Sequence, residues 1–446
     1  MAKITSIIHI CSLSGLMLLI PAILPAQEKP KEWTLDECIR YAHEQNIQIK
    51  KNKISLNESR IDTKLAKAQL FPSLSFSTSH GYTNYPAPGN TGASRNSYTG
   101  SYGLNASYTL YNGGKRKNTI KQQELQEQIQ QLEINASADD IEIAITTAYL
   151  QILYAMESVK INEQTVEVSK AQCERSKELL NAGSISKSDY AQLESQYSQD
   201  KYQLVVSQSS LEELILDLKQ LLELEITDEL SVYVPNLDDS DILTPLPSKE
   251  SVYNIALGFI PSIQSSKLSI NMAELEKVNA KSGYFPQISL NAGIGTGHIT
   301  GSDYGFGTQM KNKFNENIGV TLSVPIYSNR ENKSAVEKAK LQLEASKLDY
   351  LNSQKELLKT IESIYQDARS SQNQYNAASE QLKASQLSYE LAEEQFYLGM
   401  KNTVELLTEK NNYLSAQQEQ LQAKYMAILN LQLLNFYQDK PIKING

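Results

Sequence analysis

The stretch between Gly114 and Gly183 constrains this chain most, because it lacks proline and carries apolar residues at helical spacing. One stripe recurs at about seven-residue intervals and consists of Leu125, Ile129, Leu132, Ala136, Ile143 and Leu150. A second stripe, offset around the helix, consists of Ile134, Ile141, Ile145, Ala148, Ile152, Val159 and Val166. At ~1.5 Å rise per residue, a helix of roughly 70 residues spans on the order of 100 Å. Since a two-stranded coiled coil needs only one seam, the two stripes predict a long helix with neighbours on two sides.

A second helix is predicted to return from this glycine. After Gly183 the apolar positions again follow a seven-residue period until about Leu224. These positions are Leu193, Tyr197, Leu204, Leu211 and Leu218. The sequence therefore predicts a long helical hairpin over residues 112–225.

The segment before this hairpin changes from a helical period to a period of two. A leading helix is predicted from Trp33 to about Gln69, and Phe71 and Pro72 end it. Apolar or aromatic positions then alternate with polar ones in two runs around a loop rich in Pro, Gly and Asn. These positions are Leu74, Phe76 and Thr78, then Tyr98, Tyr102, Leu104, Ala106, Tyr108 and Leu110. This pattern predicts a β-hairpin over residues 72–111.

The second half of the chain repeats the first. Phe71 recurs as Phe285 and Gly183 as Gly399, both at an offset of about 215 residues, which indicates an internal duplication. The predicted division is a signal peptide at 1–26, a first repeat at 27–225, a linker at 226–250, a second repeat at 251–439 and a tail at 440–446. Within the second repeat we expect a leading helix broken at Pro261, a β-hairpin over 286–327 and a helical hairpin over 328–438. The returning strand of that β-hairpin is expected to carry Phe314, Ile318, Val320, Leu322, Val324 and Ile326.

Residues 1–26 are typical of a cleaved secretory signal, with Lys3 followed by an apolar run. The mature chain is therefore expected to be exported. Its two cysteines, Cys38 and Cys173, lie on distant helical segments, so we expect both to be unpaired. The net charge of -9 and the lack of a basic run argue against nucleic acid as a partner.

Any membrane insertion is expected to use strands, because no apolar run after the signal approaches the ~18 residues that a spanning helix needs. Strands of roughly 12 residues at ~3.3 Å rise reach about 40 Å, which is enough to cross a bilayer. Four strands cannot close a barrel, and an open sheet edge is not tolerated in lipid, so several copies would have to pool their strands. Three copies would give a barrel of 12 strands. The alternative is a soluble β-hairpin that caps a coiled coil.

This order of elements resembles the TolC-like outer membrane efflux and secretion channels. The resemblance rests on the two Phe-Pro strand entries, the helix entry at 111–114, and the turn motifs at 182–189 and 398–405. It implies a mainly α fold with membrane β, in which a homotrimeric 12-stranded β-barrel continues into a periplasmic α-helical barrel. It also implies three kinds of partner: outer membrane lipid, a periplasmic adaptor, and an inner-membrane pump of RND, ABC or MFS type. The expected location is the outer membrane of a Gram-negative bacterium.

The two turns are the predicted adaptor-docking site, since they repeat in both halves and lie at the far end of the tube. The predicted docking residues are Gly183, Ser184, Ile185, Gly399, Met400 and Thr403. The alternative is purely structural, because glycine supplies a positive φ at a helix end without a Cβ penalty.

A pore gate is predicted beside the turns. Asp189 and Glu405 each follow a turn glycine by six residues, where an acid also favours the helix dipole and could serve as a simple cap. The resemblance places a basic residue that keeps the pore closed at Lys401. It places a tethering tyrosine at Phe396, which has no hydroxyl, although Tyr397 is adjacent. We assign the gate to Asp189, Lys401, Glu405 and Phe396.

No catalytic, metal or cofactor site is expected. The mature part contains only His43, His80 and His298, and their spacing fits neither a metal site nor a nucleophile pattern. The resemblance implies a passive exit duct that passes substrates from an inner-membrane pump and its adaptor to the outside. The alternative function is a periplasmic structural or adaptor protein, since such proteins also use helical hairpins.

Overall fold

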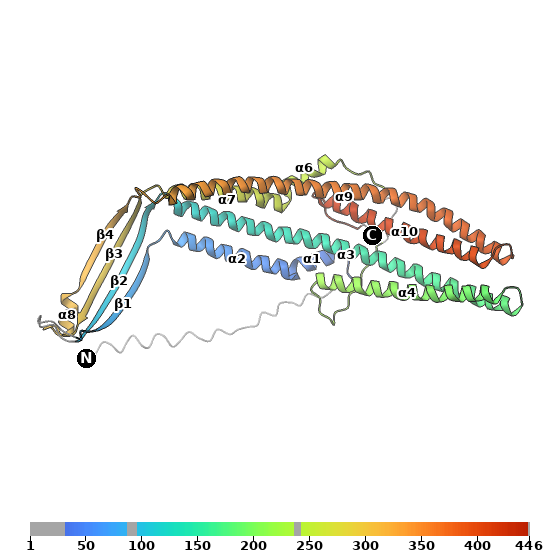
Figure 1. Ribbon diagram of the computed structural model, residues 1–446, viewed down its shortest axis with the longest axis horizontal. Coiled ribbons are helices and arrows are strands. Elements are labelled where there is room, and N and C mark those ends of the chain that lie inside the picture. Colours follow the sequence, from blue (N-terminus) through green and yellow to red (C-terminus); the bar gives the residue numbers. More distant parts are fainter. Residues whose placement is uncertain (1–31, 87–95, 236–241, 445–446) are drawn as a thin grey trace.

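The molecule is elongated (Figure 1). A small sheet lies at one end, and the two turns that connect the helices of the long hairpins lie at the other. The computed structural model describes residues 32–86, 96–235 and 242–444. The predicted signal peptide and the last two residues of the predicted tail lie outside these ranges.

The leading segment forms two helices, α1 (Leu35–Gln45) and α2 (Ile47–Ala68), where a single helix was expected. Asn46 separates them with a ψ of 130°, and its side-chain oxygen accepts the N–H groups of Gln48 at 2.8 Å and Ile49 at 3.3 Å. An asparagine that caps the next helix allows this break. The expectation of one helix was wrong because the apolar period continues across the break.

The second repeat has the equivalent break at Ile260, between α6 (Lys249–Phe259) and α7 (Pro261–Ser282). Pro261 is the first residue of α7, where its missing N–H costs no helical hydrogen bond. The expected break at Pro261 is therefore confirmed.

The sheet has four antiparallel strands in sequence order: β1 (Ser73–Asn84), β2 (Asn96–Asn112), β3 (Gln287–Ile299) and β4 (Asn315–Ser323). The pairing of β2 with β3 joins the two repeats. Among the described residues, β1 and β4 pair on one side only, so each presents a free edge.

Strand β4 is shorter than expected. Phe314, Val324 and Ile326 lie outside it, and Pro325, which cannot donate to a ladder, follows its end. The connection from β3 contains a short helix that was not expected, α8 (Phe306–Asn312). The Gln309 side chain ties α8 to the end of β3 by hydrogen bonds to the N–H and carbonyl of Ile299, at 2.9 and 3.0 Å.

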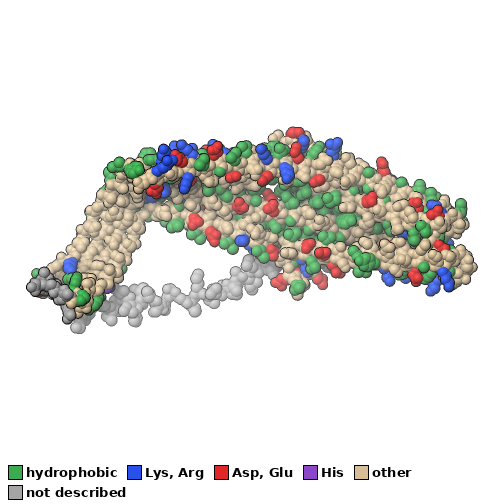
Figure 2. All heavy atoms as spheres, viewed as in Figure 1, with side chains coloured by type: hydrophobic (Ala, Val, Ile, Leu, Met, Phe, Trp, Pro, Cys, Tyr) green, Lys and Arg blue, Asp and Glu red, His purple; other side chains and the backbone are tan. Residues whose placement is uncertain are grey.

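The two faces of the sheet differ in chemistry. Phe76, Leu104 and Ile294 are register partners across three strands and share one face. That face also carries Leu74, Ile318, Val320 and Leu322, all exposed. The opposite face carries small polar residues such as Ser75, Ser77, Ser101, Asn105, Asn291 and Asn317. Figure 2 shows the strands with almost no hydrophobic or charged side chain on the side turned to the viewer.

Two long helical hairpins make up most of the molecule. The first pairs α3 (Lys115–Asn181) with α4 (Lys187–Leu221), and the second pairs α9 (Glu331–Tyr397) with α10 (Thr403–Phe436). Helix α3 packs against α2 and α7 near the sheet and against α4 and α10 nearer the turns. This agrees with the two apolar stripes on α3. None of the helices in the described ranges is long and apolar enough to cross a membrane.

The main core lies midway along the molecule, where α1, α6 and the linker meet the hairpins. Trp33 pairs with Val232 of the linker in a parallel bridge. The Tyr149 hydroxyl lies 2.6 Å from the carbonyl oxygen of Tyr233 and 3.2 Å from that of Trp33. Other fully buried residues of this core include Cys38, Ile145, Ile152, Leu218, Leu222, Ile361 and Leu434. Cys38 and Cys173 are both free thiols, as expected, and burial raises the pKa of Cys38 to about 12.

Candidate functional site

The two turns have the same backbone geometry. Gly183 and Gly399 adopt φ values of +74° and +71°, the left-handed region that glycine enters without strain. Beyond them, the N–H of Ser184 donates to Leu179 O and that of Met400 donates to Gln395 O, both at 2.8 Å. This hydrogen bond closes a Schellman motif at the end of each outgoing helix.

Each return helix begins with a capping box. The Ser186 hydroxyl accepts the N–H of Asp189 at 3.1 Å, and the Asp189 carboxylate accepts the N–H of Ser186 at 3.2 Å. Asn402 and Glu405 exchange the equivalent pair of bonds, both at 2.9 Å. Asp189 and Glu405 therefore cap their own helices.

Asp189 also joins the two hairpins. Its second carboxylate oxygen accepts a hydrogen bond from the Thr403 hydroxyl at 2.9 Å. The bonds from Ser186 and Thr403 lower the pKa of Asp189, because hydrogen bonds to a carboxylate favour its charged form. Thr403 is only 1% exposed, so its side chain serves this internal contact. Of the other predicted docking residues, Ser184 and Met400 are exposed and Ile185 is half-buried.

The other predicted gate residues lie close to this contact. Lys401 is half-buried and forms no ion pair with any described residue of its own chain. Phe396 packs edge-on against Tyr397, at 5.8 Å between ring centroids. The Arg175 guanidinium from α3 lies 3.8 Å from the centroid of the Tyr397 ring, which is a cation–π contact between the hairpins. The sequence did not predict this role for Tyr397.

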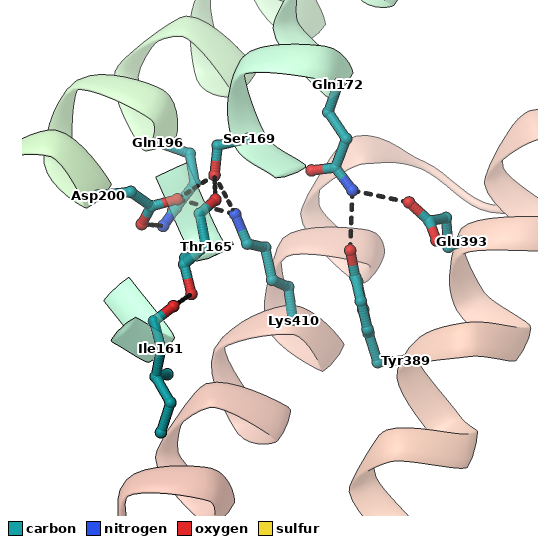
Figure 3. Close-up of polar contacts among 9 residues, drawn as sticks. All are labelled: Ile161, Thr165, Ser169, Gln172, Gln196, Asp200, Tyr389, Glu393 and Lys410. Atoms are coloured by element: carbon teal, nitrogen blue, oxygen red, sulfur yellow. Dashed lines mark hydrogen bonds and ion pairs between the residues drawn. The ribbon is translucent and has the colours of Figure 1, made fainter. Parts of the chain in front are cut away.

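A buried ion pair farther from the turns also joins the hairpins, and the sequence analysis missed it. The Lys410 ammonium of α10 lies 2.8 Å from the Asp200 carboxylate of α4 and 2.5 Å from the Ser169 hydroxyl of α3 (Figure 3). The Ser169 hydroxyl contacts the same Asp200 oxygen, and the Gln196 amide donates to the other oxygen at 2.8 Å. Lys410 is 2%, Ser169 3% and Asp200 7% exposed. A signal was present, because Leu193, Asp200 and Ser207 lie seven residues apart on one buried seam.

A second polar contact between the hairpins lies beside this ion pair. The Gln172 amide of α3 donates to the Tyr389 hydroxyl at 2.8 Å and to the Glu393 carboxylate at 2.9 Å, both on α9 (Figure 3). Burial and the nearby Glu393 carboxylate raise the pKa of Tyr389. The described residues contain no group of three or more His, Cys, Asp or Glu side chains placed to hold a metal ion.

Comparison with protein families gives two matches to one family, described as outer membrane efflux protein. The matches cover residues 38–222 and 252–436, so each repeat matches separately and both matches have the same length. Together they cover most of the chain and include both turns and the Lys410 ion pair.

Among characterised proteins, the chain is similar to outer membrane protein TolC of Escherichia coli, with 21% identity over 70% of this chain and 62% of TolC. It is 22% identical to outer membrane efflux protein BepC of Brucella suis, over 75% of this chain and 69% of BepC. The alkaline protease secretion protein AprF of Pseudomonas aeruginosa is 20% identical over 53% of this chain. The match spans about half of AprF, 48% of its length.

Solved structures share the fold. A structure of CusC superposes with a TM-score of 0.80 at 19% identity, covering 91% of this chain and 92% of the other. The CmeC outer membrane channel of Campylobacter jejuni superposes with a TM-score of 0.74 at 21% identity, covering 91% and 86%.

Proposed function

The chain belongs to the outer membrane efflux protein family, and from this premise we propose that it is the outer-membrane exit duct of a tripartite efflux or type I secretion system. The match of both repeats to the family carries the proposal. TolC, BepC and AprF, whose names describe outer membrane, efflux and secretion proteins, support it. The duct is passive, so the energy for export comes from its partners.

The proposed assembly is a homotrimer. The free edges of β1 and β4 leave backbone donors and acceptors that need partners in a lipid environment, and a second copy can supply them. Three copies of four strands give a closed barrel of 12. The apolar face of the sheet then contacts outer membrane lipid, and the Ser- and Asn-rich face lines the lumen.

The helices support the same arrangement, because α2 and α9 each carry an exposed apolar stripe. On α2 the stripe consists of Ile47, Ile54, Ile61 and Leu65, and on α9 it consists of Leu341, Leu348, Leu351 and Leu358. These side chains are 38–66% exposed in one chain. Apolar stripes of this length favour burial, so α9 of one copy is proposed to pack against α2 of the next. This contact would continue the strand barrel as a helical barrel in the periplasm.

The proposed partners meet the chain at the turns. The turns that join α3 to α4 and α9 to α10 lie at the end of the molecule farthest from the sheet (Figure 1). Their exposed residues include Ser184 and Met400, which a periplasmic adaptor could reach. An inner-membrane pump of RND, ABC or MFS type would then deliver substrate into the tube.

Purified protein in detergent tests this proposal. We expect the mass of three chains, insertion into planar bilayers and discrete single-channel currents. A monomer that neither associates with membranes nor conducts would contradict the duct and favour a periplasmic structural role. Deleting the gene and measuring sensitivity to a compound panel would then identify the substrate class.

A further inference from the structure

We propose that Lys410 is a positioning residue that holds the two helical hairpins in register and thereby keeps the turn end of the tube closed. The inference rests on the proposed duct function. It concerns a contact distinct from the predicted gate residues, because Lys410 lies farther along α10 and faces the interior of its own chain.

The ion pair is complete within one chain. Both oxygens of Asp200 have donors, from Lys410 and Ser169 on one side and from Gln196 on the other. The three helices that supply these groups are α3, α4 and α10, so the contact fixes the second hairpin against both helices of the first (Figure 3). Every other ion pair between described residues has both side chains at least one-third exposed.

Burial makes this contact sensitive to sliding. If α10 moved by one helical turn, ~5.4 Å, the ammonium and the carboxylate would separate inside the protein. Each would then be a buried charge without a partner. This is far less favourable than separating an exposed pair, because water can then solvate both charges. The Lys410 contact therefore restricts the hairpins to one register.

The remaining contacts between the hairpins, nearer the turns, depend on that register. Lys410 lies 11 residues beyond Gly399, roughly 16 Å along the helix. Within this distance the hairpins are joined by Gln172 with Tyr389, by Arg175 with Tyr397 and by Asp189 with Thr403. These contacts do not pair two buried charges, so they can break as the end opens. Lys410 thus acts as the fixed point from which the last part of each hairpin moves.

The test measures resting conductance and thermal stability of the purified trimer together. Lys410→Met keeps most of the side-chain volume and leaves Asp200 without its cation. Lys410→Met with Asp200→Asn removes both charges and is expected to recover stability, because a neutral replacement of a buried pair is often tolerated. Lys383→Met, an exposed lysine on α9, is the matched control.

We expect both Lys410 variants to raise the resting open fraction by about tenfold or more, given the cost of disrupting a buried pair. The double variant should do so while melting close to wild type, which a purely structural role would not produce. If conductance returns to the wild-type level together with stability, Lys410 has no positioning role and the inference is wrong.

Ser169→Ala provides a test that does not depend on folding of the Lys410 variants, because it leaves both charges in place. We expect a smaller rise in resting conductance, and an unchanged value in all folded variants overturns the inference. A wild-type trimer that never conducts in any state would instead count against the duct function itself. If the wild-type trimer opens and closes normally and the variants have the same resting conductance as wild type, the result counts against the role of Lys410 alone.

Discussion

Asp189 makes two separate contacts through its two carboxylate oxygens. One carboxylate oxygen completes the capping box with Ser186, and the other accepts the Thr403 hydroxyl of the second turn. A single acid therefore both starts a return helix and connects the hairpins. Sequence spacing could predict the cap, because Ser186 and Asp189 are three residues apart, the spacing of a capping box. It could not predict Thr403, because that contact requires the two repeats to lie side by side.

Replacing Thr403 with valine should separate these two roles. The side chains have similar shape, so Thr403→Val removes the hydrogen bond to Asp189 and leaves the capping box intact. We expect a higher resting conductance in planar bilayers with an unchanged helix content by circular dichroism. Thr408→Val is the control, since the exposed Thr408 hydroxyl donates within its own helix, to Val404 O at 2.8 Å. Equal currents from wild type and Thr403→Val would show that the contact does not restrain the turns.

Asp139 of α3 should make stability depend on pH. Burial, then the charges of Glu142 and Asp140, raise the pKa of Asp139 from 3.8 to about 6. The folded state therefore binds the proton more tightly than the unfolded state, so stability falls as pH rises from about 4 to about 6 and stays lower above that. Asp139→Asn should melt at a higher temperature than wild type at pH 7.5, and the difference should shrink at pH 4. Asp62→Asn, at an exposed position of α2, is the matched control, and identical profiles for wild type and Asp139→Asn would contradict the assignment.

The Lys410 ion pair shows why part of the site could not be predicted from apolar periodicity. Asp200 occupies a buried position seven residues after Leu193, where a seam of leucines normally continues. A charge at such a position signals a buried partner, but its identity depends on three helices from both repeats. Lys410 is distant from Asp200 in sequence, so only the packing of the hairpins brings the charges together.

At the scale of elements, the long hairpins, the strand pairs and the break at Pro261 follow from the sequence, whereas the break at Asn46 and the loop helix do not. A 3.6-residue period and a two-residue period are both determined by local patterning, and they run over many residues here. The break at Asn46 and the short helix α8 each depend on one side chain that bonds the backbone, Asn46 itself and Gln309. A single capping side chain adds little to any periodic signal.

The glycine turns allow a test of adaptor docking that leaves the fold intact. Nothing lies within 4 Å of a Cβ added at Gly183 or Gly399, and asparagine tolerates positive φ better than other side chains. The double variant Gly183→Asn, Gly399→Asn should therefore form trimers that melt close to wild type. If an adaptor contacts the turns, export should fall by about tenfold, which corresponds to ~1.4 kcal/mol of lost binding. Normal export by this variant would place docking elsewhere, and lower trimer stability would attribute the loss to the fold.

At the scale of the whole molecule, one chain leaves several apolar surfaces and strand edges without partners. The apolar face of the sheet, the free edges of β1 and β4, and the stripes on α2 and α9 all lie on surfaces that a monomer exposes to water. The internal order of helices near the sheet is α2, α3, α7 and α9, since extensive contacts join each of these helices to the next in the described part of the chain. Helices α2 and α9 are therefore the two outer helices of this layer, and in the proposed trimer each would meet the opposite outer helix of another copy.

Cysteine cross-linking can test this closure in the oxidising periplasm, where disulfides form readily. In a Cys173→Ser background, we expect a cysteine at Ile54 of α2 to form a disulfide with a cysteine at Leu341, Leu348 or Leu351 of α9. In one chain, α3 and α7 lie between α2 and α9, so such a disulfide must join two copies. A closed ring of three copies should then give a covalent trimer on a denaturing gel. Pairing Ile54→Cys with Leu216→Cys, an exposed position on α4, should give no trimer. A ladder that stops at dimers would indicate a two-chain assembly, and no cross-link at any of the three positions would mean that these stripes do not meet.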